Sequence, residues 1–479
     1  MATARNFVVD TRPLWIILLQ SGRQPLLLLI GIAIYLTIRY VLSPEGLDPT
    51  GHRALAVFAL CVFYWVFDVL PLMITSILAI VLLPLTDILP AKEAYSLFGN
   101  EAVFFILGAF ILAAAMMKSG LSSRLALMIL GRFGHDPIAL LRGIFLLNAT
   151  MSFFMSEHAV AAMTFPIIVE IIAALHLPPE RVNYGKSLVL AMAWGSTIGG
   201  VATLLGGARA PLALGILREL TGDTYTFTQW AVMNIPLTIL LSVVAWILLR
   251  TFFPVGSMDI SKAEQAVQQR LLELGRMTLQ ERIIAVVMIA TVAAWIVLGE
   301  QYGLAGVALS AVVVLFALRA VQWRDVEGYV NWGLILMYGG AISLGSALHK
   351  SGAAVWLADQ TIVHWATGPV TVILLITAAA IFLTEVMSNS AAVAILMPLS
   401  IAVATQFDVN PRLMAPLVAV PAGLSFMLPI GTPANAMAFS SGYLRVRDLA
   451  LPGLILNFAG LAIFNAMIWF YWPWLGVSP

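Results

Sequence analysis

Long apolar runs separated by short polar turns repeat along the whole chain. A helix of about 20 apolar residues crosses the hydrocarbon core of a bilayer. Backbone that lies in lipid must satisfy its own hydrogen bonds, and a helix does so. We therefore predict eleven membrane-spanning helices, at residues 25–43, 52–69, 72–89, 101–117, 187–205, 230–250, 281–298, 302–319, 331–348, 411–430 and 451–472.

Two further apolar stretches, 138–176 and 368–406, do not fit as ordinary single spans. Lysine and arginine collect on the cytoplasmic side of membrane proteins. The chain follows this bias if its N-terminus is cytoplasmic and both stretches are re-entrant hairpins, the first from inside and the second from outside. The C-terminus then lies outside. Few basic residues fall on the outer side, namely Arg39, Arg53, Lys92, Arg218, Lys350 and Arg412.

Composition supports this class of protein. Hydrophobic residues make up 61% of 479 and charged residues 10%, against about 25% charged in a soluble domain, and the mean hydropathy is +0.97. The net charge of +1 provides no basic surface for nucleic acid, and the single cysteine, Cys61, excludes a disulfide or thiolate-metal framework. The first 24 residues carry Arg5, Arg12 and Arg23 without a small-residue cleavage site, so we expect no removable signal peptide.

Two landmarks in the chain recur with one offset. MMKSGL has its lysine at Lys118 and LHKSGA at Lys350, a shift of 350 − 118 = 232. FFMSEHAVAAMTFPI has its serine at Ser156 and TEVMSNSAAVAILMPL at Ser388, and 388 − 156 is again 232. Downstream, LLGGARAPLAL and LPIGTPANAMAF align with a shift of 225. An odd number of predicted spans separates the halves, so they are expected to be inverted, as in many secondary transporters.

Four polar or glycine-rich islands interrupt apolar runs at repeat-related positions. A helix that stops and restarts there exposes N–H groups and carbonyls, which bind an anion and a cation. The simpler interpretation, that Ser and Asn only join helices, suits one island better than four. The islands are Ser156-Glu157-His158, Gly206-Gly207-Ala208-Arg209, Ser388-Asn389-Ser390 and Gly431-Thr432-Pro433-Ala434-Asn435.

At these residues the chain resembles the divalent anion/sodium symporter family, carriers of dicarboxylates and sulfate. TEVMSNSAAVAILMPL is similar to the family's second Ser-Asn-Thr hairpin motif, and GTPANAMAFSSG to its Gly-Thr-Pro-Pro-Asn segment. VFDVLPLMITSILAIVLLPLTDIL (66–89) and FSSGYLRVRDLALPGLILN (439–457) resemble the early and late family signatures. The match covers nearly the whole length.

The resemblance implies an all-α polytopic membrane protein with eleven helices and two re-entrant hairpins in two inverted repeats. It also implies a dimerising scaffold and an elevator-type transport domain. We expect scaffold helices in 1–97 and 283–329, a cytoplasmic linker in 255–282, and the repeats in 98–254 and 330–479, with helix breaks near 206–210 and 431–435. We expect the inner membrane of a bacterium.

Family members bind an anion between the hairpin tips and cations beside each tip. The resemblance implies no other cofactor. In the second half it assigns one substrate carboxylate to Asn389 and Ser390, with Thr432 and Pro433 facing them and Ser388 at the tip. It assigns one Na⁺ to Thr384, Met387, Asn389 and the carbonyls from Pro429 to Gly431, which suits a hard cation. Glu385, beside Thr384, either tunes this site or packs against a polar neighbour.

The first half departs from the family pattern. Glu157 and His158 replace Asn and Thr of the hairpin motif, while Gly207 and Arg209 replace Thr and Pro of the later segment. Ser152, the counterpart of Thr384, and Ser156 are retained. These residues are predicted to line the substrate site, and Ser152, Glu157 and Arg209 to form the first cation site or its replacement.

We favour a Glu157–Arg209 ion pair in which the guanidinium takes the place of a sodium ion, because arginine stays charged and forks onto carboxylates. Sodium coupling is then reduced. Glu157 and His158 as a proton site, Arg209 as a direct anion ligand, and a purely structural pair are the alternatives. The chain then carries a small divalent anion as symporter, proton-coupled carrier or exchanger.

Two other classes of protein fit less well. An intramembrane hydrolase requires a metal set or a nucleophile motif, and the chain has no HExxH and no Gly-x-Ser-x-Gly. A channel is compatible with paired re-entrant segments, but the charged residues and the carrier signatures favour a transporter. No residue pattern distinguishes a C4-dicarboxylate from a tricarboxylate or sulfate.

Overall fold

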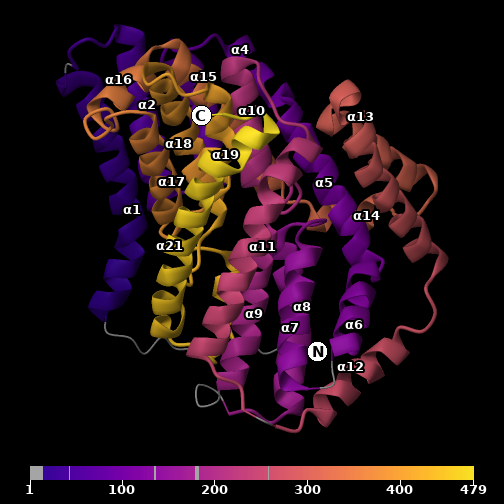
Figure 1. Ribbon diagram of the computed structural model, residues 1–479. Coiled ribbons are helices and arrows are strands. Elements are labelled where there is room, and N and C mark those ends of the chain that lie inside the picture. The colour runs from indigo at the N-terminus through magenta and orange to yellow at the C-terminus, as the bar shows by residue number, and fades with distance from the viewer. Residues whose placement is uncertain (1–13, 43, 134–135, 179–182, 257, 479) are drawn as a thin grey trace, which may run out of the picture.

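The structure, a computed structural model, describes residues 14–42, 44–133, 136–178, 183–256 and 258–478 (Figure 1). Within these ranges the chain forms helices, turns and loops without strands. Seven of the described helices are long and apolar enough to cross a membrane, among them α5 (Glu101–Lys118), α11 (Phe227–Phe252) and α21 (Val446–Phe470). Arg5 and Arg12, used in the argument on the signal peptide, lie outside the described residues.

Seven α-helices lie in the described part of each of the two predicted repeats. Figure 1 shows the helical hairpin α7–α8 in the lower half of the view and its counterpart α17–α18 in the upper half. The first series is α5, α6 (Leu121–Phe133), α7 (Pro137–Met151), α8 (Glu157–Ala174), α9 (Asn183–Gly199), α10 (Arg209–Thr221) and α11. The second is α15 (Trp332–Lys350), α16 (Ala353–Gln360), α17 (Pro369–Thr384), α18 (Asn389–Gln406), α19 (Met414–Ala419), α20 (Pro433–Ser440) and α21.

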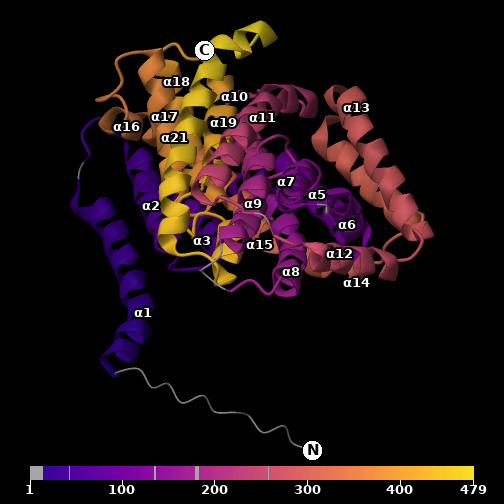
Figure 2. The same ribbon diagram turned by 60° about the horizontal axis from the view of Figure 1, so that its bottom comes forward.

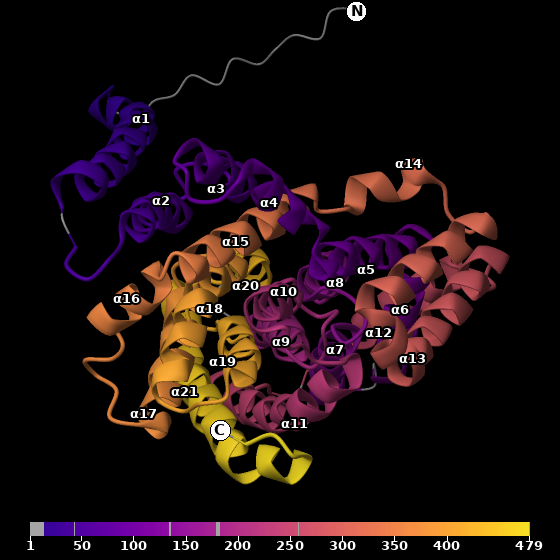
Figure 3. The ribbon, with the colours of Figure 1, turned by 90° about the horizontal axis from the view of Figure 1, so that it is seen from above.

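The other helices flank these two series. Seen from above, α7–α11 and α17–α21 form a central group, with α1–α3 on one side and α12–α14 on the other (Figure 3). Figure 2 shows α1 at the edge of the molecule, where it packs against α2. Their bounds are α1 (Leu14–Leu36) with the π-helical turn Thr37–Val41, α2 (Pro49–Val66), α3 (Leu72–Leu85), α4 (Ala91–Ser96), α12 (Ser261–Glu273), α13 (Leu279–Ala317) and α14 (Trp323–Val326).

Most predicted spans are helices whose ends lie within a few residues of the expected positions. The adjoining predictions 281–298 and 302–319 together form α13, whose two helical segments meet at Gly303, where φ is 70°. Glycine adopts this left-handed conformation without a Cβ clash. The chain therefore reverses between two spans without a longer loop.

The prediction of a continuous helix over 411–430 was wrong. The chain is helical only in α19 and in the short 3₁₀ turns at Pro411–Leu413 and Pro421–Gly423, and it is not helical from 424 to 432. Pro416, Pro421 and Pro429 cannot donate a main-chain hydrogen bond, and each ring clashes with the preceding turn of a helix. The break in the second half therefore begins well before the expected residues 431–435. In the first half the chain leaves the helix at Gly199 and resumes it at Arg209.

The two predicted hairpins are present as helix–turn–helix units. Asp136 caps α7 by accepting hydrogen bonds from the N–H groups of Ile138 and Ala139, both at 2.9 Å. Ser388 caps α18 and accepts from the N–H of Ala391 at 3.2 Å. Ser156 and Ser388 thus both precede the second helix of their hairpins, but only Ser388 caps that helix with its side chain.

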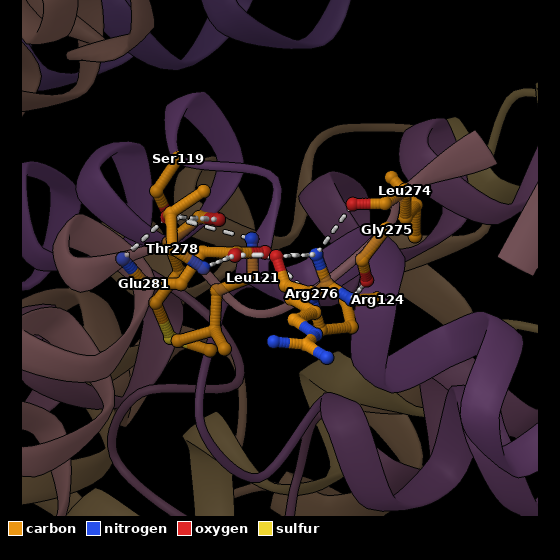
Figure 4. Close-up of polar contacts among 9 residues, drawn as sticks. Ser119, Leu121, Arg124, Leu274, Gly275, Arg276, Thr278 and Glu281 are labelled. Atoms are coloured by element: carbon orange, nitrogen blue, oxygen red, sulfur yellow. Dashed lines mark hydrogen bonds and ion pairs between the residues drawn. The ribbon is translucent and has the colours of Figure 1, made fainter. Parts of the chain in front are cut away.

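The predicted linker helix is α12, and a buried ion pair holds the chain that follows it. Arg124 of α6 donates from Nε to Glu281 Oε1 at 2.7 Å and from Nη1 to the carbonyl of Gly275 at 2.8 Å. Figure 4 shows Arg124 surrounded by these acceptors and by the carbonyl of Leu274. Glu281 also completes a capping box with Thr278. The linker is therefore fixed to α6, the helix before the first hairpin.

The two halves interlock where their helices are interrupted. α8 of the first hairpin packs against α20, which restarts after the break in the second half. In the corresponding way α18 of the second hairpin packs against α10, which restarts after the break in the first half. Most residues of the four polar islands are buried, whereas Ser156, His158, Ala208 and Ser388 are half-buried and Pro433 is exposed.

Candidate functional site

Glu157 and Arg209 form a bidentate ion pair in the interior. Arg209 donates from Nη1 to Glu157 Oε1 at 2.9 Å and from Nη2 to Glu157 Oε2 at 3.1 Å. The side chains of Arg209 and Glu157 are 2% and 0% exposed, respectively. Each residue is the first of its helix, α10 and α8. The positive end of the helix dipole favours the carboxylate and disfavours the guanidinium, so the carboxylate is what stabilises the arginine here.

Three glycines make room for this pair. A Cβ at Gly200 would overlap a carboxylate oxygen of Glu157, and a Cβ at Gly207 would overlap Nη1 of Arg209. A Cβ at Gly423 would overlap Nε and Nη2 of the same guanidinium. Gly423 belongs to the second half, so the arginine reaches across to the break of the opposite repeat.

The other predicted first-half residues surround the pair. Ser152 is buried, and its hydroxyl has no hydrogen-bond partner among the described residues. Ser156 is half-buried. His158 places Nδ1 3.8 Å from Glu157 Oε1, and its side chain is 39% exposed. The N–H of Glu157 donates to the carbonyl of Gly206 at 2.9 Å, which joins the hairpin tip to the helix break.

In the second half, three oxygen atoms meet at Thr384. Its Oγ1 lies 2.6 Å from Asn389 Oδ1 and 3.0 Å from the carbonyl oxygen of Ala422. A hydroxyl has one proton, so it satisfies only one of the two acceptors at a time. A hard cation binds all three oxygens at once. The donor set therefore fits a sodium ion.

The other residues predicted for the second-half site cap a helix, begin it or are buried. Thr432 caps α20, accepting from the N–H of Asn435 at 3.1 Å, and Pro433 is the exposed first residue of that helix. Ser390 and Met387 are buried, with 7% and 5% exposure.

The carbonyl that reaches Thr384 differs from the expected ones. The carbonyls from Pro429 to Gly431 were expected to bind the cation. Pro429 is half-buried and Gly431 is buried, and both lie in the non-helical segment. The Thr384 hydroxyl instead contacts the carbonyl of Ala422, seven residues before Pro429. The main chain of the second half therefore contributes to the cluster from the start of the break.

Several residues of the site could not be predicted from the sequence. Gly200, Gly423 and Ala422 act through the absence of a side chain or through the main chain. Tyr338 of α15 is buried and donates from its hydroxyl to the carbonyl of Ala208, beside Arg209. Only Asn457 carried a signal, because an asparagine in an apolar span needs a partner, and it donates to Glu385 Oε1 at 2.7 Å.

The chain is similar in sequence to known membrane transporters. A family model described as the sodium:sulfate symporter transmembrane region matches residues 23–478. The sodium-dependent dicarboxylate transporter SdcS of Staphylococcus saprophyticus is 27% identical over 472 residues, which cover 93% of this chain and 91% of that protein. The protein of the same name from Staphylococcus aureus is 29% identical over 479 residues, covering 95% and 92%.

Two solved structures share the fold at low sequence identity. The YdaH transporter of Alcanivorax borkumensis superposes with a TM-score of 0.53 at 16% identity, covering 80% of this chain and 89% of that one. MtrF of Neisseria gonorrhoeae superposes with a TM-score of 0.55 at 13% identity, covering 80% and 84%. At these identities the likeness supports the fold alone.

Proposed function

Because this chain belongs to the sodium:sulfate symporter family, a family of secondary transporters and not of enzymes, we propose that it carries a small divalent anion across the membrane with reduced sodium coupling. The names of its relatives, sodium-dependent dicarboxylate transporters, make a C4-dicarboxylate the first substrate to test. The anion is bound between the two hairpin tips, where His158 and Ser390 lie on opposite halves.

The bidentate pair of Glu157 and Arg209 is the observation that carries this proposal. At the 232-residue shift Glu157 is the counterpart of Asn389, whose Oδ1 belongs to the oxygen cluster of the second half. Both carboxylate oxygens of Glu157 already accept hydrogen bonds from the guanidinium. Arginine remains protonated throughout the physiological range. The first half therefore carries a permanent guanidinium, balanced by Glu157, in place of an exchangeable sodium ion.

The second half keeps a donor set for one sodium ion, at Thr384, Asn389 and the carbonyl of Ala422. A transporter with one fixed and one exchangeable cation moves fewer sodium ions per substrate than one with two exchangeable sites. The low exposure of Arg209 also argues against the guanidinium as a direct ligand of the anion. We assign that contact to the half-exposed His158 and Ser156 instead.

The arrangement of helices suits an elevator. In this proposal α7–α11 and α17–α21 move as the transport domain, and both hairpins are re-entrant in two inverted repeats. α1–α5 and α13–α15 form the scaffold, through which two copies associate. The N-terminus is cytoplasmic and the C-terminus lies outside, in the inner membrane of a bacterium.

A proton-coupled carrier is the second candidate, because His158 Nδ1 is buried without a hydrogen-bond partner among the described residues, 3.8 Å from Glu157 Oε1. A proton on Glu157 would have to displace one of its two bonds to Arg209. The ion pair therefore favours sodium over protons as the coupling ion.

The proposal is tested by uptake of a labelled C4-dicarboxylate into proteoliposomes, with the Na⁺ gradient, the pH gradient and internal substrate varied independently. Uptake is expected to rise hyperbolically with external Na⁺, as one coupled ion requires. An imposed pH gradient at constant Na⁺ is expected to leave uptake unchanged, because the proposal couples no proton to transport.

Each contrary result identifies a different error. A sigmoidal dependence on several sodium ions refutes the built-in cation. Uptake driven by a pH gradient supports the proton-coupled carrier, and uptake that requires internal substrate supports an exchanger. Flux that does not saturate with substrate indicates a channel.

A further inference from the structure

Glu385 is a buried carboxylate held by neutral hydrogen-bond donors. It lies at the end of α17 in the second hairpin and is 3% exposed. Its Oε1 accepts from the N–H groups of Phe426 at 2.8 Å and Met427 at 3.0 Å, and from Asn457 Nδ2 at 2.7 Å. Its Oε2 accepts from the N–H of Leu428 at 3.0 Å. Among the described residues no cation forms an ion pair with it.

These contacts suit an anion and no neutral side chain of the same shape. Three successive N–H groups of an irregular segment form a concave site for negative charge. A glutamine at position 385 has only one acceptor oxygen, and its NH₂ group would face the N–H of Leu428 or of Phe426 and Met427. The hydrogen bonds therefore require the carboxylate itself.

The segment that Glu385 holds is the helix break of the second half. Asn435 holds the same segment from the opposite end, donating to the carbonyls of Ser425 at 3.1 Å and Leu428 at 3.2 Å. A Cβ built on Gly431 would lie 3.0 Å from Glu385 Oε2. The path of the chain from 425 to 431 is thus fixed around this carboxylate.

The same turn of the hairpin carries the oxygen cluster described above. Thr384 immediately precedes Glu385, and it contacts Asn389 Oδ1 and the carbonyl of Ala422. The carboxylate therefore fixes the hairpin tip relative to the broken helix that supplies the carbonyl. It also places a negative charge, without a counter-ion among the described residues, one residue away from the cluster.

The first half has no such carboxylate at the matching position. The counterpart of Glu385 at the 232-residue shift is Phe153, whose carbonyl accepts from Thr203 Oγ1 at 2.7 Å. There the break is held by the Thr203 hydroxyl and by a main-chain hydrogen bond from Glu157 to Gly206, and the charges of Glu157 and Arg209 cancel. The uncompensated negative charge lies in the half whose donor set fits a sodium ion.

We propose that Glu385 is the positioning residue of the sodium site in the second half: it fixes the break segment 425–431 and supplies the negative charge that a bound cation offsets. This inference rests on the proposed function, which places Na⁺ at Thr384 and Asn389.

The test is the stabilisation of purified full-length protein by NaCl, titrated against choline chloride at constant ionic strength without substrate. A unit charge at roughly 6 Å from a cation, at an effective dielectric constant of about 20, changes its affinity more than tenfold. Glu385→Gln is therefore expected to raise the Na⁺ concentration for half-maximal stabilisation at least about tenfold. Glu385→Asp, which keeps the charge and shortens the side chain, is expected to give a smaller increase.

Thr377→Val provides the matched control. Thr377 is buried on the same helix and also joins α17 to α21, accepting from Asn465 Nδ2 at 3.0 Å. This variant is expected to unfold at a lower temperature in choline chloride but to keep the wild-type Na⁺ midpoint, as a purely structural role predicts.

The results separate this inference from its premise. If the wild-type protein shows no stabilisation by Na⁺, the sodium site of the proposed function is wrong and the inference falls with it. If the wild-type protein responds and Glu385→Gln has the same midpoint, only the role of Glu385 is wrong. If Glu385→Gln does not fold, an unchanged midpoint in Glu385→Asp overturns the inference, and a raised one supports it.

Discussion

Arg209→Ala is expected to abolish anion uptake and to destabilise the protein by about 3–5 kcal/mol, because it leaves a buried carboxylate without its partner. Glu157 is 0% exposed, and water cannot replace the two hydrogen bonds from the guanidinium. The measurements are the thermal unfolding midpoint in detergent and uptake into proteoliposomes at saturating Na⁺.

The matched variant is the double substitution Glu157→Asn with Arg209→Ala. It gives the first half the residues that the second half has at Asn389 and Ala434. Removing both charges is expected to restore most of the lost stability, since residues in direct contact show non-additive effects. Uptake is expected to return with a steeper dependence on Na⁺, because an exchangeable ion then enters beside Ser152. If Arg209→Ala and the double variant lose equal stability and uptake, Arg209 does not act through its ion pair with Glu157.

Features that repeat along the chain could be predicted from the sequence. The shift of 232 residues is sufficient to locate both hairpins, because polar tips such as Ser156 and Ser388 are rare within apolar runs. An acid in one island and a base in the other island of the same half indicate their partnership. In the first half the predicted break, 206–210, also overlaps the end of the observed one, which runs from Gly199 to Arg209.

Features that depend on the main chain or on the opposite repeat could not be predicted in this way. The carbonyl of Ala422 reaches Thr384 only because the helix expected over 411–430 is broken. The hydropathy of this stretch does not predict that break. Glu385 is visible in the sequence as an acid in an apolar hairpin. Its donors, however, include backbone N–H groups about forty positions away along the chain, and no side-chain pattern encodes them.

Glycine at position 423 is explained by the same interlock of the halves. Gly207 and Gly423 lie on two sides of the guanidinium of Arg209, and a Cβ on either would overlap it. Glu157 holds the third side through both oxygens. The side chain of Arg209 is therefore confined by two repeats at once, and it cannot move away from an added methyl group without leaving the carboxylate.

Gly423→Ala is consequently expected to reduce uptake nearly as far as Arg209→Ala, with a loss of stability of about 1–3 kcal/mol, typical of overpacking a buried site. Gly299→Ala is the control: Gly299 is also buried, within α13, and its Cβ would meet no heavy atom within 4 Å. It is expected to retain wild-type uptake. Alanine in a helix interior is about 0.5–1 kcal/mol better than glycine, so its unfolding midpoint is expected to hold or rise.

The decisive comparison places Gly423→Ala in the background that carries Glu157→Asn and Arg209→Ala. With the guanidinium gone, the added methyl group occupies the space that the arginine leaves, so the substitution is expected to cost little there in uptake or in unfolding midpoint. A loss as large as in the wild-type background would mean that the methyl group collides with something other than Arg209. In that case Gly423 does not act by leaving room for the guanidinium, and Arg209 is held by Glu157 and Gly207 of its own half alone.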